Sequence, residues 1–280
     1  MSGFFFQNSP HTDKPLTGKV AVITGSTSGI GKAIAEMLAA AGADIVLNGF
    51  GDAAEIEKQR QNLVSKTGVR VFYSDADMSK PAEIRDMIEK AHQALGRVDI
   101  LVNNAGIQHV CTVENFPEEK WDQIIAINLS AAFHAVKAVA KYMKQQTGGR
   151  IINIASVHGL TASPYKSAYI TAKHGIIGFT KAVALDLAEH GITVNAVCPG
   201  YVRTPLVDKQ IPEQARSYGM TEDEVIAKVM LKNHAIKEFV GVEDIAASVL
   251  YLCSDAAAKV TGTQMVLDGG WLAGTPANKG

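Results

Sequence analysis

The chain has 280 residues, 47% of them hydrophobic, and a formal net charge of −1 at pH 7. This length and apolar content allow one large core, so we expect a single domain. Lysine and arginine are spread along the chain, which excludes the electrostatic footprint of a protein that binds nucleic acid or an acidic membrane. A small-molecule partner is favoured.

The chain ends and the cysteines indicate a soluble cytoplasmic protein. Residues 1–15 lack the basic region and cleavage site of a signal peptide, so we expect a loose extension there and a frayed tail at 274–280. No stretch reaches the ~18 apolar residues that a spanning helix needs. Cys111, Cys198 and Cys253 are odd in number and far apart, which is typical of buried thiols in a reducing compartment.

Short β-rich runs alternate with longer helical patterns along the chain. Strands are expected at 19–24, 44–50, 70–75, 98–106, 149–156, 192–200 and 262–270, and helices at 31–42, 53–68, 81–96, about 118–146 and around Tyr169. This alternation is the signature of βαβ units, in which both faces of a parallel sheet are covered. The predicted fold is a doubly wound, Rossmann-type α/β domain over residues 16–273.

Residues 203–240 interrupt this alternation with polar, charged, helix-prone sequence and no predicted strand. An irregular insertion of this kind is more often a mobile lid than part of the core. We therefore expect a helical substrate lid within the catalytic domain.

The glycine-rich run "VITGSTSGIGK" joins the first predicted strand to the first helix. Gly25, Gly29 and Gly31 would let the backbone approach a pyrophosphate, which the helix N-terminus would attract. The spacing differs from the standard G-x-G-x-x-G fingerprint, and an ordinary glycine turn is the alternative. The position between a strand and a helix favours nucleotide binding.

The segment "SPYKSAYITAK" contains two tyrosines and two lysines. Tyr169 and Lys173 are four residues apart, so a helix would place them on one face, with the ammonium close to the phenol. Lys166 lies three residues before Tyr169 and would share that face. Tyr165 is interpreted as a packing residue.

Several motifs in a fixed order resemble the short-chain dehydrogenase/reductase family. They are "TGSTSGIG", "NNAG" at 103–106, Asn128, Ser156, Tyr169-x-x-x-Lys173 and "PG" at 199–200, and the match runs from about Leu16 to Trp271. The resemblance implies a doubly wound sheet with strand order 3-2-1-4-5-6-7, a nicotinamide cofactor and commonly a homotetramer.

The expected catalytic residues are Asn128, Ser156, Tyr169 and Lys173. A secondary alcohol must lose its hydroxyl proton as hydride leaves, and a free tyrosine, with a pKa of about 10, is too weak a base near neutral pH. Positive charge from Lys173 and the oxidised cofactor would lower that pKa, which makes Tyr169 the expected general base. The resemblance implies that Ser156 holds the substrate oxygen and Asn128 a water in a proton relay with Lys173.

The resemblance also implies the cofactor contacts. They are Gly25, Thr27, Ser28, Gly29, Ile30, Gly31, Phe50, Asp77, Met78, Asn104, Ala105, Gly106, Tyr169, Lys173, Pro199, Gly200 and Val202. Gly49 stands where many NAD-dependent relatives carry aspartate, which weakens an assignment to NAD. Ser28 stands where relatives that prefer NADP often have a basic residue, and no lysine or arginine follows the second strand until Lys58. The balance favours NAD.

A short hydroxy acid is the expected substrate. Gln108, His158 and Lys166 would face one cavity, and a cation with two hydrogen-bonding groups suits a small carboxylate. Taken singly, His158 and Lys166 are better explained as a loop histidine at the surface and a solvated lysine. With Gln210 and Trp271 the set resembles the bacterial branch of the family that acts on (R)-3-hydroxybutyrate, in which matching residues bind the carboxylate and close over the methyl end.

Two alternatives remain open. Another reductase of the family, acting on 3-oxoacyl thioesters or sugars, would bring no free carboxylate to Lys166 and His158. A non-catalytic dinucleotide sensor would be expected to lose Tyr169 or Lys173, and both are present. The eight histidines are scattered and form no H-E-x-x-H motif, so no metal site is expected.

Overall fold

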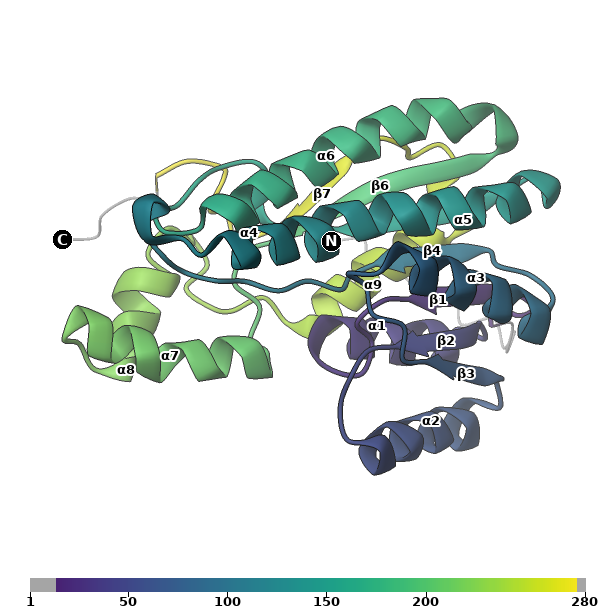
Figure 1. Ribbon diagram of the computed structural model, residues 1–280, viewed down its shortest axis with the longest axis horizontal. Coiled ribbons are helices and arrows are strands. Elements are labelled where there is room, and N and C mark those ends of the chain that lie inside the picture. The colour runs from purple at the N-terminus through teal and green to yellow at the C-terminus, as the bar shows by residue number, and fades with distance from the viewer. Residues whose placement is uncertain (1–13, 276–280) are drawn as a thin grey trace, which may run out of the picture.

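The computed structural model describes residues 14–275 and contains one seven-stranded sheet (Figure 1). All neighbouring strands are parallel, in the order β3-β2-β1-β4-β5-β6-β7. The strands are β1 Val20–Ile23, β2 Asp44–Asn48, β3 Val71–Ser74, β4 Ile100–Asn103, β5 Gly149–Ile154, β6 Ile192–Pro199 and β7 Gln264–Leu267. The predicted fold class and strand order are confirmed. The predicted extension and tail fall almost wholly outside the described residues.

Helices cover both faces of the sheet because successive strand residues point to opposite sides. In β1, Ala21 and Ile23 pack with α1, α2 and α9, whereas Val20 and Val22 pack with α3, α5 and α6. All four are fully buried, which explains the apolar character of both faces. The main helices are α1 Gly29–Ala40, α2 Ala53–Thr67, α3 Pro81–Leu95, α4 Glu118–Ile125, α5 Ala131–Gln145, α6 Ser167–Leu187, α7 Pro205–Tyr218, α8 Glu222–Val225 and α9 Val242–Cys253.

The predicted long helix is continuous from Glu118 to Gln145, but a π-turn, η2 Ala126–Ser130, joins α4 to α5. By length and composition this is the one helix among the described residues that could cross a membrane, contrary to the expectation that no stretch would pass that test. It packs against α3 and α6 and contributes Ala135 and Val139 to the core. It is therefore placed as a core helix of the domain.

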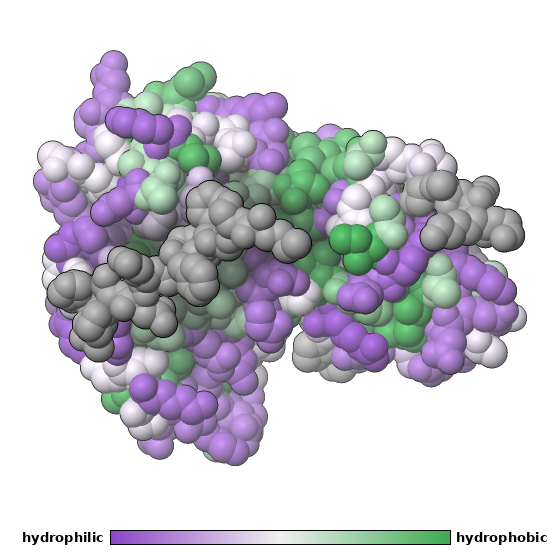
Figure 2. Space-filling view, turned by 180° about the vertical axis from the view of Figure 1, so that it is seen from behind, coloured by the Kyte–Doolittle hydropathy of each residue, from purple (hydrophilic) through white to green (hydrophobic). Residues whose placement is uncertain are grey.

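Residues 203–240 form a helical arm with α7, α8 and the π-turn η5 Ile226–Met230. The arm has a small core of its own, built from Ile211, Ala215, Val225 and Met230. Figure 1 shows α7 and α8 beside the main body, and Figure 2 shows a notch in the surface between the two. The two ends of the arm lie side by side, because Val202 and Val240 form a parallel bridge.

No helix was expected between the arm and β7, where the structure places α9. The "VEDIAASVLYLC" segment buries Ile245, Val249 and Leu252 at helical spacing against α1. That period was readable from the sequence. The missed helix completes the cover on one face of the sheet.

Candidate active site

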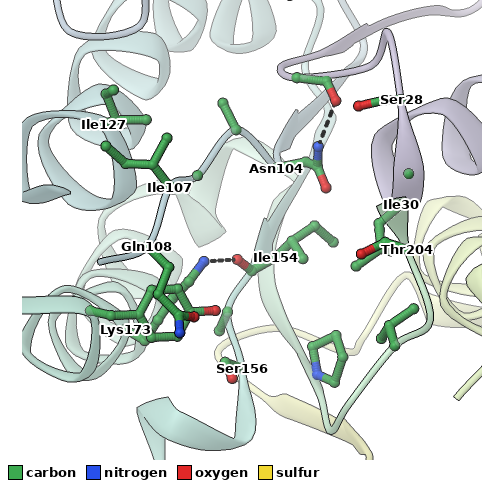
Figure 3. A pocket seen from close by; sticks show the side chains of 18 of the residues that line it. Ser28, Ile30, Asn104, Ile107, Gln108, Ile127, Ile154, Ser156, Lys173 and Thr204 are labelled. Atoms are coloured by element: carbon green, nitrogen blue, oxygen red, sulfur yellow. Dashed lines mark hydrogen bonds between the residues drawn. The ribbon is translucent and has the colours of Figure 1, made fainter. Parts of the chain in front are cut away.

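A cavity of about 460 Å³ opens at the carboxyl ends of the strands, where doubly wound sheets bind their ligands. In Figure 3, Ser28, Ile30 and Thr204 lie on one side of it, and Gln108, Ser156 and Lys173 on the other. The cavity runs from the glycine loop to Trp271. The same cavity is therefore lined by residues of both the predicted cofactor site and the predicted substrate site.

Most of the predicted site residues line this one cavity. Three do not: Gly31 is buried behind the loop, Asn128 lines a small neighbouring cavity beside Lys173, and the side chain of Gln210 lies outside the described part of the structure. The predicted residues that do line it are Gly25, Thr27, Ser28, Gly29, Ile30, Phe50, Asp77, Met78, Asn104, Ala105, Gly106, Gln108, Ser156, His158, Lys166, Tyr169, Lys173, Pro199, Gly200, Val202 and Trp271.

The glycine loop is shaped by close backbone packing. A Cβ on Gly31 would lie 2.4 Å from the Gly25 carbonyl oxygen and 2.5 Å from Asn104 Nδ2, and Gly25 has a φ of +64°. The Ser28 side chain makes no capping hydrogen bond at the start of α1. The first N–H groups of α1 therefore suit an anion such as a pyrophosphate, and the loop fits a dinucleotide.

Two asparagine side chains, Asn48, which is buried, and Asn104, which is half-buried, hold this loop in place. Asn48 Oδ1 accepts a hydrogen bond from Gly25 N at 3.2 Å, and its Nδ2 donates to the carbonyls of Ser74 and Ala76. Asn104 Nδ2 donates to the carbonyl oxygen of Gly25 at 3.1 Å (Figure 3). Sequence reasoning missed Asn48, although an asparagine that ends a buried strand beside a predicted site is itself a signal.

The packing at the end of the cavity where adenosine is expected explains the unusual Gly49. This glycine has a φ of +145°, and a Cβ there would lie 2.6 Å from Thr27 Oγ1. The Thr27 hydroxyl donates to the Phe50 carbonyl at 3.1 Å, and the Phe50 ring is 66% exposed at the cavity. An aspartate at position 49 would not fit without movement of Thr27.

The pair predicted to transfer the proton, Tyr169 and Lys173, lies at the middle of the cavity on α6. Lys173 Nζ donates to the Ile154 carbonyl at 2.7 Å and lies 5.6 Å from the centre of the Tyr169 ring (Figure 3). Burial lowers the pKa of Lys173 to about 8 and raises the pKa of Tyr169 to about 12, with a smaller lowering by Ser156. The Tyr169 residue retains partial exposure, but its phenol end is enclosed by protein.

In the protein by itself, desolvation of the phenolate is the largest influence on the pKa of Tyr169 and raises it. The expectation of a lowered pKa counted the positive charge of an oxidised nicotinamide together with that of Lys173, and it stays a prediction.

Asn128 has a role that the sequence did not suggest. It sits in the π-turn, its Oδ1 accepts from Ile107 N, and its Nδ2 donates to the Ile107 carbonyl, both at 2.9 Å. The side chain therefore anchors the loop that carries Gln108. The expected water in a relay with Lys173 stays a prediction.

The other end of the cavity is aromatic and contains two ionisable groups. His158 Nε2 lies 2.8 Å from Ser163 Oγ, and burial, followed by the charge of Lys166, lowers the pKa of His158 to about 4. Burial also lowers the pKa of Lys166, whose Nζ donates to the Tyr201 hydroxyl at 3.4 Å. At pH 7 the histidine is therefore neutral, and the buried lysine lacks an anionic partner among the described residues.

Tyr201 is a lining residue that sequence reasoning missed. Its ring stacks on Trp271 with centroids 5.8 Å apart and an interplanar angle of 11°. Its position directly after "PG" was the available signal. By contrast, Tyr165 is not a packing residue, since it is 51% exposed and has a φ of +66°.

Comparisons with known proteins show the family of the chain. A family model described as short chain dehydrogenase matches residues 19–215. A protein of Rhizobium meliloti (strain 1021) named D-beta-hydroxybutyrate dehydrogenase is 57% identical over 255 residues, covering 91% of this chain and 99% of the relative. A Cupriavidus necator protein of the same name is 52% identical over 262 residues, covering 92% and 99%.

A solved structure from Sinorhizobium meliloti 1021, a short-chain alcohol dehydrogenase by its description, superposes with a TM-score of 0.83. It is 35% identical and covers 93% of this chain and 99% of its own. The fold, the glycine loop and the Tyr169–Lys173 pair lie within the matched regions. The chain belongs to the short-chain dehydrogenase/reductase family.

Proposed function

We propose that this enzyme oxidises (R)-3-hydroxybutyrate to acetoacetate with NAD, and catalyses the reverse reduction. The observation that carries the proposal is the placement of Lys166, His158 and Gln108 in the same cavity as Tyr169. This arrangement puts a site for a carboxylate beside a site for proton transfer. The names of the two similar bacterial proteins support the same substrate.

The carboxylate site has a physical reason to bind an anion. Desolvation destabilises the Lys166 ammonium, and a substrate carboxylate beside it would offset that cost through a charge-assisted hydrogen bond. Neutral His158 and Gln108 would donate further hydrogen bonds. The stacked rings of Tyr201 and Trp271 would cover the apolar methyl end.

We assign Tyr169 as the group that takes the hydroxyl proton during oxidation and returns it during reduction. The bound nicotinamide would exchange a hydride with the substrate carbon, and its oxidised form would supply positive charge. The Ser156 hydroxyl would hold the substrate oxygen next to Tyr169. Lys173 would stabilise the phenolate from one helical turn away.

NAD rather than NADP is the proposed cofactor. The cavity is lined at its adenosine end by Thr27, Ser28, Phe50 and Asp77, and within the described chain no lysine or arginine lines that end. Lys80 approaches Asp77 at 3.7 Å but also pairs with Glu83. A 2′-phosphate would therefore meet a carboxylate without a free cation, which disfavours NADP.

The arm of residues 203–240 is proposed to close over the substrate and exclude water. Hydrogen exchange in α7 and α8 should slow when cofactor and substrate are both present. Equal exchange with and without them would indicate a fixed wall instead.

A homotetramer in the cytoplasm is proposed for the assembly. Large apolar side chains are exposed on α5, α6, α9 and β7, namely Phe133, Leu185, Tyr251 and Val266, and copies of the chain packed through these elements would cover them. Light scattering would measure the mass. Cys111, Cys198 and Cys253 are free, and only Cys111 is partly exposed, which suits a reducing compartment.

Initial rates test the proposed activity. We expect high kcat/KM for (R)-3-hydroxybutyrate with NAD, and much lower values for the S enantiomer and for NADP. Turnover of 3-oxoacyl thioesters or sugars, with no turnover of any free hydroxy acid, would favour the alternative reductase. A protein that binds NAD without turnover of any of these compounds would be the sensor.

A further inference from the structure

His234 is a buried histidine that lies next to the cavity without lining it. Its side chain is 0% exposed, and within the described chain neither ring nitrogen has a hydrogen-bond partner, although the Glu238 backbone is near. Burial lowers its pKa, so the ring is neutral at pH 7. A buried polar ring without partners is unfavourable, and its presence at this point requires an explanation.

The ring of His234 supports the aromatic wall of the substrate site from behind. Its centroid is 5.6 Å from that of Trp271 and 6.3 Å from that of Tyr201. His158 meets Trp271 edge-on at 5.4 Å. Trp271 is thus enclosed by three rings, of which Tyr201 and His158 line the cavity and His234 does not.

The backbone around His234 is shaped for this ring. A Cβ on Gly200 would lie 3.0 Å from its Cε1, and a Cβ on Gly269 would lie 3.0 Å from its Nδ1. Because neither glycine has a side chain, removal of the imidazole would leave a void that these neighbours cannot fill.

The chain on both sides of this packing is tied together. Ala235 N and Ile236 N both donate to the Gly269 carbonyl, at 2.7 and 2.8 Å. The buried Asp268 carboxylate accepts from the backbone N–H groups of Gly270 and Leu272. The segment that leaves the arm is therefore fixed to the turn that carries Trp271.

We propose that His234 is a positioning residue that holds Trp271 and Tyr201 against the substrate and so limits the length of the acyl chain; this rests on the proposed function. In the wild-type enzyme the wall stands close behind the methyl group of a four-carbon acid. With the ring removed, Trp271 can retreat into the void and longer 3-hydroxy acids fit.

The test compares kcat/KM for (R)-3-hydroxybutyrate and (R)-3-hydroxyhexanoate in wild type and in His234→Ala. Burial of two more methylene groups predicts a rise of about tenfold in the ratio of the longer to the shorter acid. The loss on the four-carbon acid should appear mainly in KM, with NAD affinity unchanged. An unchanged ratio in the alanine variant overturns the proposal.

Two matched variants separate positioning from general destabilisation. His234→Leu restores the side-chain volume without the ring nitrogens and should keep the wild-type ratio of kcat/KM values. An equal rise of this ratio in His234→Ala and His234→Leu would overturn the proposal. Met143→Ala removes a buried side chain beside Gly149, at the amino end of β5 and away from the cavity, and should lower stability without changing the ratio. If His234→Ala does not fold, His234→Val should give a smaller rise of the same sign.

A spectroscopic measurement keeps this inference separate from the proposed function. In a Trp121→Phe background, acrylamide should quench Trp271 fluorescence more strongly in His234→Ala than in His234→Leu. If wild type turns over no free 3-hydroxy acid, the proposed function fails and quenching alone decides whether His234 positions Trp271. Equal quenching in both variants overturns that role.

Discussion

The half of the cavity proposed to bind the cofactor and the half proposed to bind the substrate, called here the cofactor half and the substrate half, are built in different ways. The cofactor half is formed mostly by backbone: Gly25 and Gly31 pack at van der Waals limits, and Asn48 and Asn104 fix the loop with hydrogen bonds to main-chain atoms. The substrate half is formed by side chains from distant segments, including Lys166, His158, Tyr201 and Trp271. Burial lowers the pKa values of Lys166 and His158, and Lys166 has no anionic partner in the described part of the chain.

The difference shows where each half obtains its selectivity. A loop that binds through its backbone recognises the pyrophosphate, which is the same whatever the substrate. Few loop sequences allow such close backbone packing, so a short motif reveals the loop. A wall of side chains is suited to one substrate. Its buried polar groups lack some of their hydrogen-bond partners until that substrate binds, which is energetically unfavourable. Changes in one half should therefore leave binding in the other largely intact.

The largest expected effect lies where the halves meet. Tyr169→Phe removes only the proton-transferring hydroxyl, so kcat should fall about 10³-fold while NAD affinity stays nearly unchanged. Steady-state kinetics and a binding titration measure the two quantities. Tyr165→Phe is the matched control, since that ring is exposed and outside the cavity. Near wild-type turnover in Tyr169→Phe would contradict the base assignment.

In the cofactor half, Gly31→Ala should weaken NAD binding on the order of a hundredfold. The new Cβ would meet the Gly25 carbonyl, and backbone cannot yield as a flexible side chain can. Gly148→Ala is the control, because its Cβ would meet nothing closer than the Gly191 carbonyl at 3.8 Å. Isothermal titration with NAD measures the change. Unaltered affinity in Gly31→Ala would mean that the loop is not the pyrophosphate site.

In the substrate half, Lys166→Met should lower kcat/KM for the acid by roughly tenfold to a hundredfold, the value of one charge-assisted hydrogen bond. The methyl ester of the substrate has no charge for Lys166 to bind, so the gap between acid and ester should narrow while NAD affinity is unchanged. Lys66→Met, on the exposed face of α2, is the control. An equal loss for acid and ester would show that Lys166 only supports the helix start.

The same division explains how much could be predicted from sequence. The glycine loop and the Tyr169–Lys173 pair follow from local motifs, the alternation of strands and helices follows from periodicity, and the strand order was implied by the family resemblance; the structure has them as expected. Tyr201 and His234 were missed because their roles depend on contacts with Trp271, which is distant in the chain. The pKa of Tyr169 was missed because burial has no signal in a four-residue spacing.

The last expected effect concerns stability rather than activity, and it is a pH dependence that belongs to the substrate half. Burial and the charge of Lys166 hold the pKa of His158 at about 4, against 6.5 in the unfolded chain. Between these values the unfolded chain binds more protons than the folded one. The contribution of His158 to the free energy of unfolding is therefore fully present above pH 6.5 and is lost as the pH falls toward 4.

The size of this loss follows from the pKa difference. At about 1.4 kcal/mol per pH unit, His158 should contribute a loss of up to about 3 kcal/mol, and it needs no correction for solvent screening because the side chain is 5% exposed. Urea denaturation of wild type and His158→Gln at pH 7, 5.5 and 4.5, at one protein concentration, measures it. The curve for the variant should be flatter, because glutamine does not titrate. The control is His190→Gln, at an exposed position after α6, and its free energy of unfolding should change with pH as in wild type. If the curves of unfolding free energy against pH for wild type and His158→Gln were parallel, His158 would be as easily protonated in the folded enzyme as in the unfolded chain.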